Sequence, residues 1–122
     1  MRPAALLLVP LAVACTTVNP AALAPQGTTV ELGESVRSGP AVLTPIGVME
    51  DSRCPRDVQC VWAGRVVLSV RVENAGSLID ATVVLGQKET VAGHVFTLEE
   101  VSPHRMSEGE IANADYRFRF SP

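Results

Sequence analysis

Aromatic side chains are scarce in this chain of 122 residues, which contains one tryptophan, one tyrosine and three phenylalanines. A basic excess is missing as well, since 10 Lys and Arg stand against 13 Asp and Glu, a formal net charge of −3. No long run of either charge occurs. Because phosphate binding needs a basic footprint, this balance argues against nucleic acid as a partner.

Long apolar runs are also missing. No run reaches the roughly 18 residues that a membrane-spanning helix needs, which excludes a multi-pass membrane protein. Hydrophobic residues nevertheless make up 47% of the chain, which is enough for a packed core and too much for a disordered chain. The length corresponds to a single domain.

The local motifs of common enzyme classes are absent from the sequence: G-x-S-x-G, H-E-x-x-H, the P-loop and G-x-G-x-x-G do not occur. The two histidines, His94 and His104, both stand next to turn residues. We therefore expect a protein that is not an enzyme and that holds no metal or cofactor. Two alternatives stay open: a Ser–His–Asp set assembled in three dimensions, and a copper site in which Met49 and Met106 join the histidines.

The N-terminus has the pattern of a signal peptide. Arg2 is followed by an uncharged, mostly apolar stretch over residues 3–14, which is too short to span a bilayer as a helix. An N-terminal core helix is the rival interpretation, but Pro10 near its middle would break that helix. We expect residues 1–14 to be removed on export.

Residues 11–15 (LAVAC) resemble the lipobox of bacterial lipoproteins. In that family, small residues precede an obligatory cysteine, whose thiol receives a diacylglycerol before the signal peptide is cleaved. The resemblance implies that Cys15 is the lipidated N-terminus of an exported, membrane-anchored protein, although Ala12 departs from the usual Leu, Val or Ile. Thr16 follows the cysteine where Asp would direct retention, which implies the outer membrane, facing the periplasm, if the cell is diderm.

Cysteine usage favours the same interpretation. The chain has three cysteines, and an odd number in an exported protein needs an explanation. Cys54 and Cys60 are close enough in sequence to pair in an oxidising compartment, and lipidation would account for Cys15. The alternative is cleavage after Ala24, which would discard Cys15 and release a soluble protein.

The segment after the cysteine reads as a tether, because it is uncharged and contains Pro20, Pro25 and Gly27. The expected organisation has three parts: a signal peptide over 1–14, the lipidated cysteine and flexible tether over 15–27, and a single β domain over 28–122.

Within that domain, apolar residues alternate with a period of two, which is typical of half-buried strands. The alternation covers positions 66–72, 79–85, 96–98 and 116–120. We expect the aromatic residues of the last segment to be buried, and we expect residues 42–49 to form an edge strand because Pro45 interrupts them. The pattern predicts an all-β fold, a small antiparallel sandwich or barrel of about six to seven strands. An open sheet with a small helix is the alternative.

Residues 51–64 (DSRCPRDVQCVWAG) resemble a segment of small exported bacterial proteins that share D-S-R-C-P and then C-x-W-x-G before a long strand. The resemblance implies a β fold and an envelope location, and it supplies no reaction.

The same segment has a physical interpretation. Cys54 and Cys60 would form a structural disulfide, and zinc is disfavoured because a second pair of ligands is missing. We expect Asp51 to accept backbone N–H groups in a turn, and Arg53 to donate to a carboxylate or to loop carbonyls. We expect the Trp62 ring to pack over the disulfide in the core. The alternative is partner recognition by four residues of the segment: Asp51, Arg53, Arg56 and Trp62.

For function, we expect a non-catalytic envelope lipoprotein whose β domain binds a protein or cell-wall partner and whose lipid on Cys15 contacts the membrane. The alternative is a small β-scaffold inhibitor of an exported hydrolase that presents the Arg53–Asp57 loop, in which Arg53 or Arg56 suits a trypsin-like pocket. A protruding loop favours the inhibitor, whereas burial of Trp62 and Arg53 excludes it.

Overall fold

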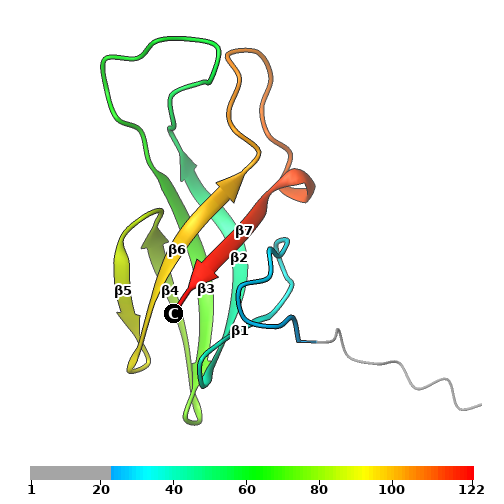
Figure 1. The fold of residues 1–122 in the computed structure, drawn as a ribbon, viewed down its shortest axis with the longest axis vertical. Helices are drawn as coiled ribbons and strands as arrows, with labels where there is room; N and C mark the ends of the chain where they lie inside the picture. Colours follow the sequence, from blue (N-terminus) through cyan, green and yellow to red (C-terminus); the bar gives the residue numbers. More distant parts are fainter. Residues whose placement is uncertain (1–22) are drawn as a thin grey trace, which may run out of the picture.

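The structure is a computed structural model that describes residues 23–122. The signal segment, Cys15 and most of the expected tether lie outside the described residues. Figure 1 shows the elements in chain order: β1 (Val36–Ser38), β2 (Ala41–Asp51), β3 (Val66–Asn74), β4 (Ser77–Val84), β5 (Lys88–Val91), β6 (His94–Ser102), the short 3-10 turn η1 (Asn113–Asp115) and β7 (Arg117–Ser121).

The strands form two antiparallel sheets. The first has the order β1-β2-β3-β4 and the second has the order β5-β6-β7. In Figure 1, β6 and β7 cross in front of β2 and β3, so the sheets are stacked as two layers. The prediction of a small all-β antiparallel sandwich is confirmed. Within the described part of the chain, no helix is long and apolar enough to cross a membrane.

The core lies between the two sheets and follows the period-two pattern. β3 directs one face inward along its whole length, and the facing sheet contributes phenylalanines. Because each buried aliphatic or aromatic side chain stabilises the fold by about 1.5–3 kcal/mol, this cluster is the main source of stability. Its largest members are Leu43, Leu68, Leu98, Phe96 and Phe118, with Phe120 and Tyr116 also buried.

The edge strand β4 departs from the predicted pattern. Alternating burial was expected from residue 79 to residue 85, but Val83 is the fully buried residue of this strand, and Ile79 is 43% exposed. The reason is geometric: β4 is the edge strand of its sheet, with no strand on its outer side. Val72, which pairs with Ile79 from β3, is fully buried at the same level. An edge strand that its covering layer does not fully reach keeps its alternation in sequence and loses the burial.

The expectation that Pro45 marks an edge strand is wrong, because β2 lies between β1 and β3. The proline is accommodated because β1 pairs only with residues 41–43 of β2 and does not extend as far as Pro45. The Pro45 carbonyl accepts a hydrogen bond from Gly33 N at 2.7 Å. The N and C=O of one residue point to the same side of a strand, so the missing donor of Pro45 does not face β3.

The N-terminal segment covers two sheet edges. Ala24 hydrogen-bonds along β1, donating to Ser35 O at 3.0 Å and accepting from Arg37 N at 2.9 Å. Val30 exchanges two hydrogen bonds with Phe118 in β7, at 2.9 and 2.8 Å. The contacts of the domain therefore include Ala24, within the segment that we assigned to the tether.

Two long connections lie together at one end of the sandwich, opposite the β3–β4 hairpin (Figure 1). The β2–β3 connection contains both domain cysteines, and the β6–β7 connection runs over residues 103–116.

Candidate functional site

The β2–β3 connection, residues 52–65, is closed by a disulfide and is called the stapled loop here. Cys54 and Cys60 are bonded, with their Cα atoms 5.8 Å apart, so the predicted pairing is confirmed. A disulfide restricts the unfolded chain and thereby favours the single folded conformation of the loop.

An ion pair holds the start of the stapled loop. The Arg53 guanidinium donates to both carboxylate oxygens of Asp51, from Nε to Oδ1 at 2.9 Å and from Nη2 to Oδ2 at 2.8 Å. The side chains are only 14% and 8% exposed, and Arg53 N also approaches Asp51 Oδ1 at 3.4 Å. The expected roles of both residues, a turn carboxylate and a forked guanidinium, are confirmed.

The same pair connects the two sheets. Arg53 Nη1 donates to Val101 O at 2.9 Å and Nη2 donates to Pro103 O at 3.0 Å, which ties β2 to the end of β6. The Tyr116 hydroxyl donates to Asp51 Oδ2 at 2.8 Å, which adds the start of β7. We call these three side chains the Asp51–Arg53–Tyr116 cluster.

Hydrogen bonding fixes the protonation states in this cluster. Burial raises the pKa of the Asp51 carboxyl, but the hydrogen bonds from Arg53 and Tyr116 and the charge of Arg53 outweigh burial, so the pKa lies below its ordinary value of 3.8. Burial, together with the hydrogen bond to Asp51, raises the pKa of Tyr116 to about 12. At neutral pH, Asp51 is therefore ionised and Tyr116 keeps its proton.

Further contacts bind the stapled loop to the 103–116 connection. Arg105 Nη1 donates to Arg53 O at 2.8 Å, and Arg56 N donates to Arg105 O at 2.7 Å. The Asp57 carboxylate accepts from Ser107 N at 2.8 Å and also from the Ser107 hydroxyl. Each loop therefore limits the movement of the other.

The end of the stapled loop requires glycine at position 64. Ser52 and Arg65 face each other, with Ser52 N donating to Arg65 O at 2.9 Å and Arg65 N donating to Ser52 Oγ at 3.0 Å. This pairing brings Ser52 O against Gly64, where an added Cβ would lie only 1.7 Å from that oxygen. The glycine of the C-x-W-x-G pattern is thus a steric requirement of the loop.

The expectation that Trp62 packs in the core is wrong. The side chain is 61% exposed, its neighbour Val61 is 98% exposed, and Val58 in the same loop is 44% exposed. β3 begins only at Val66, after the Gly64 contact, so Trp62 belongs to the loop and not to the strand. The loop extends beyond the ends of the strands (Figure 1).

The structure thus separates the four candidate recognition residues into two kinds. Asp51 and Arg53 bind each other within the domain, whereas Arg56 and Trp62 are exposed on the stapled loop. The alternating pattern of residues 116–120 predicted burial of Tyr116 but not its bond to Asp51. The signal for this bond in the sequence was the predicted burial of the tyrosine, because a buried tyrosine hydroxyl generally needs a hydrogen-bond partner.

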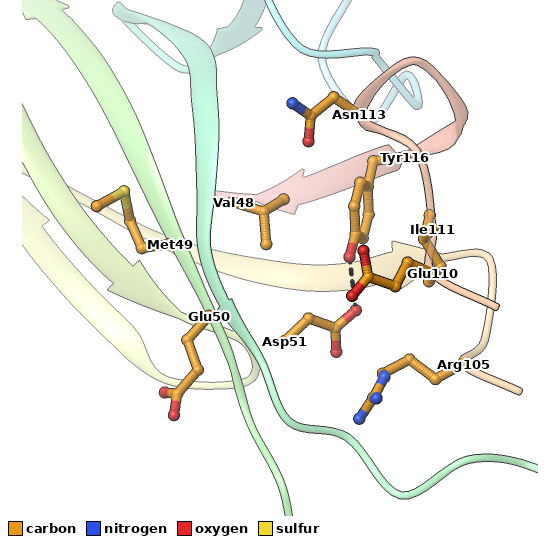
Figure 2. A pocket seen from close by; sticks show the side chains of 9 residues that line it. All are labelled: Val48, Met49, Glu50, Asp51, Arg105, Glu110, Ile111, Asn113 and Tyr116. Atoms are coloured by element: carbon orange, nitrogen blue, oxygen red, sulfur yellow. Dashed lines mark hydrogen bonds between the residues drawn. The ribbon is translucent and has the colours of Figure 1, made fainter. Parts of the chain in front are cut away.

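A cavity of about 360 Å³ lies beside the cluster, between the end of β2 and the 103–116 connection (Figure 2). We call it the β2 cavity. Its lining is mostly polar, and part of its wall is apolar. The residues that line it are Val48, Met49, Glu50, Asp51, Arg105, Glu110, Ile111, Asn113 and Tyr116. Across residues 23–122, no group of three or more His, Cys, Asp or Glu side chains is arranged to hold a metal ion.

No protein-family model, no curated protein and no solved structure matches this chain. The two resemblances noted in the sequence, to the lipobox and to the D-S-R-C-P segment, therefore stay predictions.

The Gly64 contact gives a matched pair of variants. Gly64→Ala should lower the free energy of unfolding by about 3 kcal/mol or more, because backbone atoms must move to admit the methyl group. Gly47→Ala, in β2, should cost less than about 1 kcal/mol, since a Cβ there meets nothing within 4 Å. Urea denaturation of both variants measures the difference. Equal effects would contradict the steric role of Gly64.

The lowered pKa of Asp51 predicts a specific pH dependence. Ionised Asp51 contributes stability that is fully present above its unfolded pKa near 3.8 and is lost as pH falls through the lower folded pKa. Asp51→Asn leaves the buried Arg53 guanidinium without its counter-ion, and should cost about 3 kcal/mol at neutral pH.

The gap in unfolding free energy between wild type and Asp51→Asn should therefore shrink as pH falls below about 4. Urea denaturation at a series of pH values measures it. A gap that stays constant down to about pH 2 would show that Asp51 does not titrate in this way.

Proposed function

We propose that this chain is a non-catalytic lipoprotein of the bacterial cell envelope, anchored through Cys15, whose stapled loop binds a protein or cell-wall partner. The observation that carries the proposal is the exposed Trp62 on a loop that is held by a disulfide and by the Asp51–Arg53–Tyr116 cluster. The two halves of the proposal, location and recognition, rest on different residues and have separate tests.

Two features support the envelope location. The Cys54–Cys60 disulfide fits an oxidising compartment such as the periplasm. Ala24 takes part in the fold through its bonds to Ser35 and Arg37. A chain cleaved after Ala24 would lose these bonds, so the contacts favour a mature protein that starts earlier, as lipidation of Cys15 requires.

Recognition is supported by the way in which the stapled loop exposes apolar groups. Trp62 and Val61 remain largely in water and Val58 is partly exposed, although contacts hold the loop around them. Trp is strongly enriched among residues that dominate interface energies. A fixed loop also loses little conformational entropy on binding. The loop lies at the end of the domain opposite the β3–β4 hairpin, where neither sheet covers it (Figure 1).

In the hydrolase-inhibitor alternative, Arg56 is the one of the two candidate arginines that stays available to a protease pocket. Arg53 is 14% exposed and its guanidinium is bound to Asp51, Val101 and Pro103, so it is not free to enter a protease pocket. Arg56 is exposed in the stapled loop and keeps this alternative open. Recovery of a hydrolase that depends on Arg56 and not on Trp62 would favour the inhibitor.

The location is tested at the cysteine. Cys15→Ser should abolish incorporation of labelled fatty acid and leave uncleaved precursor or a soluble form, because the thiol is the acceptor of the lipid. Wild type should fractionate with membranes and begin at a modified Cys15 by mass spectrometry. An unmodified N-terminus at Pro25 would refute the anchor.

Recognition is tested by removing the indole. Trp62→Ala should change the free energy of unfolding by less than about 0.5 kcal/mol and should reduce partner recovery after crosslinking in native membranes by about tenfold or more. Leu78→Ala is the matched control, because Leu78 is 62% exposed on the β3–β4 hairpin. It should leave recovery unchanged. Equal recovery by Trp62→Ala and wild type would refute recognition through the stapled loop.

A further inference from the structure

The β2 cavity is a second site, distinct from the exposed apolar residues of the stapled loop. One wall is β2, through Val48, Met49 and the residues that follow, and the other is the 103–116 connection (Figure 2). Its volume of about 360 Å³ is at the small end of the range for ligand pockets. A ligand that fills it is therefore a small molecule.

Two of the ionised groups at the cavity are already neutralised within the domain. The Asp51 carboxylate is bound by Arg53 and Tyr116. The Glu50 carboxylate is bound by Arg65. Neither acid needs a ligand to satisfy its charge.

The other two ionised groups, Arg105 and Glu110, are not neutralised. Among residues 23–122, neither side chain takes part in an ion pair. The Arg105 guanidinium uses Nη1 for Arg53 O, which leaves its other donors for a ligand. The Glu110 carboxylate accepts no hydrogen bond from a described residue. The cavity thus presents one positive and one negative group that do not neutralise each other.

A ligand that carries both charges can satisfy these two groups. Figure 2 shows Arg105 and Glu110 extending from the same connection with their charged ends apart, and Ile111, the residue after Glu110, beside them. A carboxylate would bind the Arg105 guanidinium, and an ammonium group would bind Glu110. Asn113 adds an amide, and Val48 and Ile111 provide apolar contact for a side chain.

We propose that the β2 cavity binds a zwitterionic α-amino acid with an aliphatic side chain. The ligand carboxylate contacts Arg105, its ammonium group contacts Glu110, and its side chain lies against Ile111. This inference does not rest on the proposed function, because it uses neither Cys15 nor Trp62.

The test removes each charge from the ligand in turn. The purified full chain, kept in detergent if it fractionates with membranes, is titrated calorimetrically with three ligands: leucine, N-acetylleucine, which lacks the ammonium group, and leucinamide, which lacks the carboxylate. Leucine should bind about fivefold or more tightly than either derivative, because each derivative loses one charge-assisted contact.

The protein variant completes a thermodynamic cycle. In Glu110→Gln, leucine should bind no better than N-acetylleucine, because the ammonium group has lost its partner. Glu110 is exposed and has no bond to a described residue, so this variant should unfold at the wild-type urea concentration. Glu108→Gln is the matched control: Glu108 is a neighbouring exposed glutamate that does not line the β2 cavity, and its removal should leave all three affinities unchanged.

The absence of saturable leucine binding to wild type would overturn the proposal. A preference for leucine over N-acetylleucine that survives in Glu110→Gln would overturn it as well. Either result would leave partner recovery through Trp62 untouched, so failure here is distinguishable from failure of the proposed function.

Discussion

The buried ion pair between Asp51 and Arg53 is the contact on which the functional end of this domain depends. Removing two charges from water is costly, and such a pair is tolerated only when hydrogen bonds satisfy its remaining atoms. Here the guanidinium also donates to two carbonyls at the end of β6, and the Tyr116 hydroxyl donates to the carboxylate. One pair therefore joins β2, β6 and β7 at the point where the sandwich ends and the loops begin.

The shape of both candidate binding surfaces depends on that contact. The stapled loop leaves β2 through Arg53, and its disulfide and the Asp57–Ser107 bonds hold the segment that carries Trp62. The β2 cavity is lined by two members of the same cluster, Asp51 and Tyr116. A buried electrostatic contact thus supports one apolar and one polar surface on neighbouring loops.

A strand was predictable from sequence where its apolar face packs against the other sheet and its more polar face is turned away from the core. β3 and β7 show this, because one face of each meets the other sheet and the alternation of side chains reports it directly. β4 and β2 were misjudged for the opposite reason. Burial of Ile79 depends on how far the second sheet extends sideways over β4, and the tolerance of Pro45 depends on how far β1 extends along β2. The local sequence pattern specifies neither distance.

The same division holds at the site. The sequence by itself determined the Cys54–Cys60 disulfide, because a short separation leaves few other geometries, and it determined the kinds of partner that Asp51 and Arg53 take, but not that these two residues bind each other. Only the tertiary structure decided that Tyr116 completes Asp51 and that Arg105 and Glu110 face one cavity, since these groups come from distant parts of the chain. It also decided the exposure of Trp62, because burial of a ring depends on what lies beneath the loop, and here the strands have already ended.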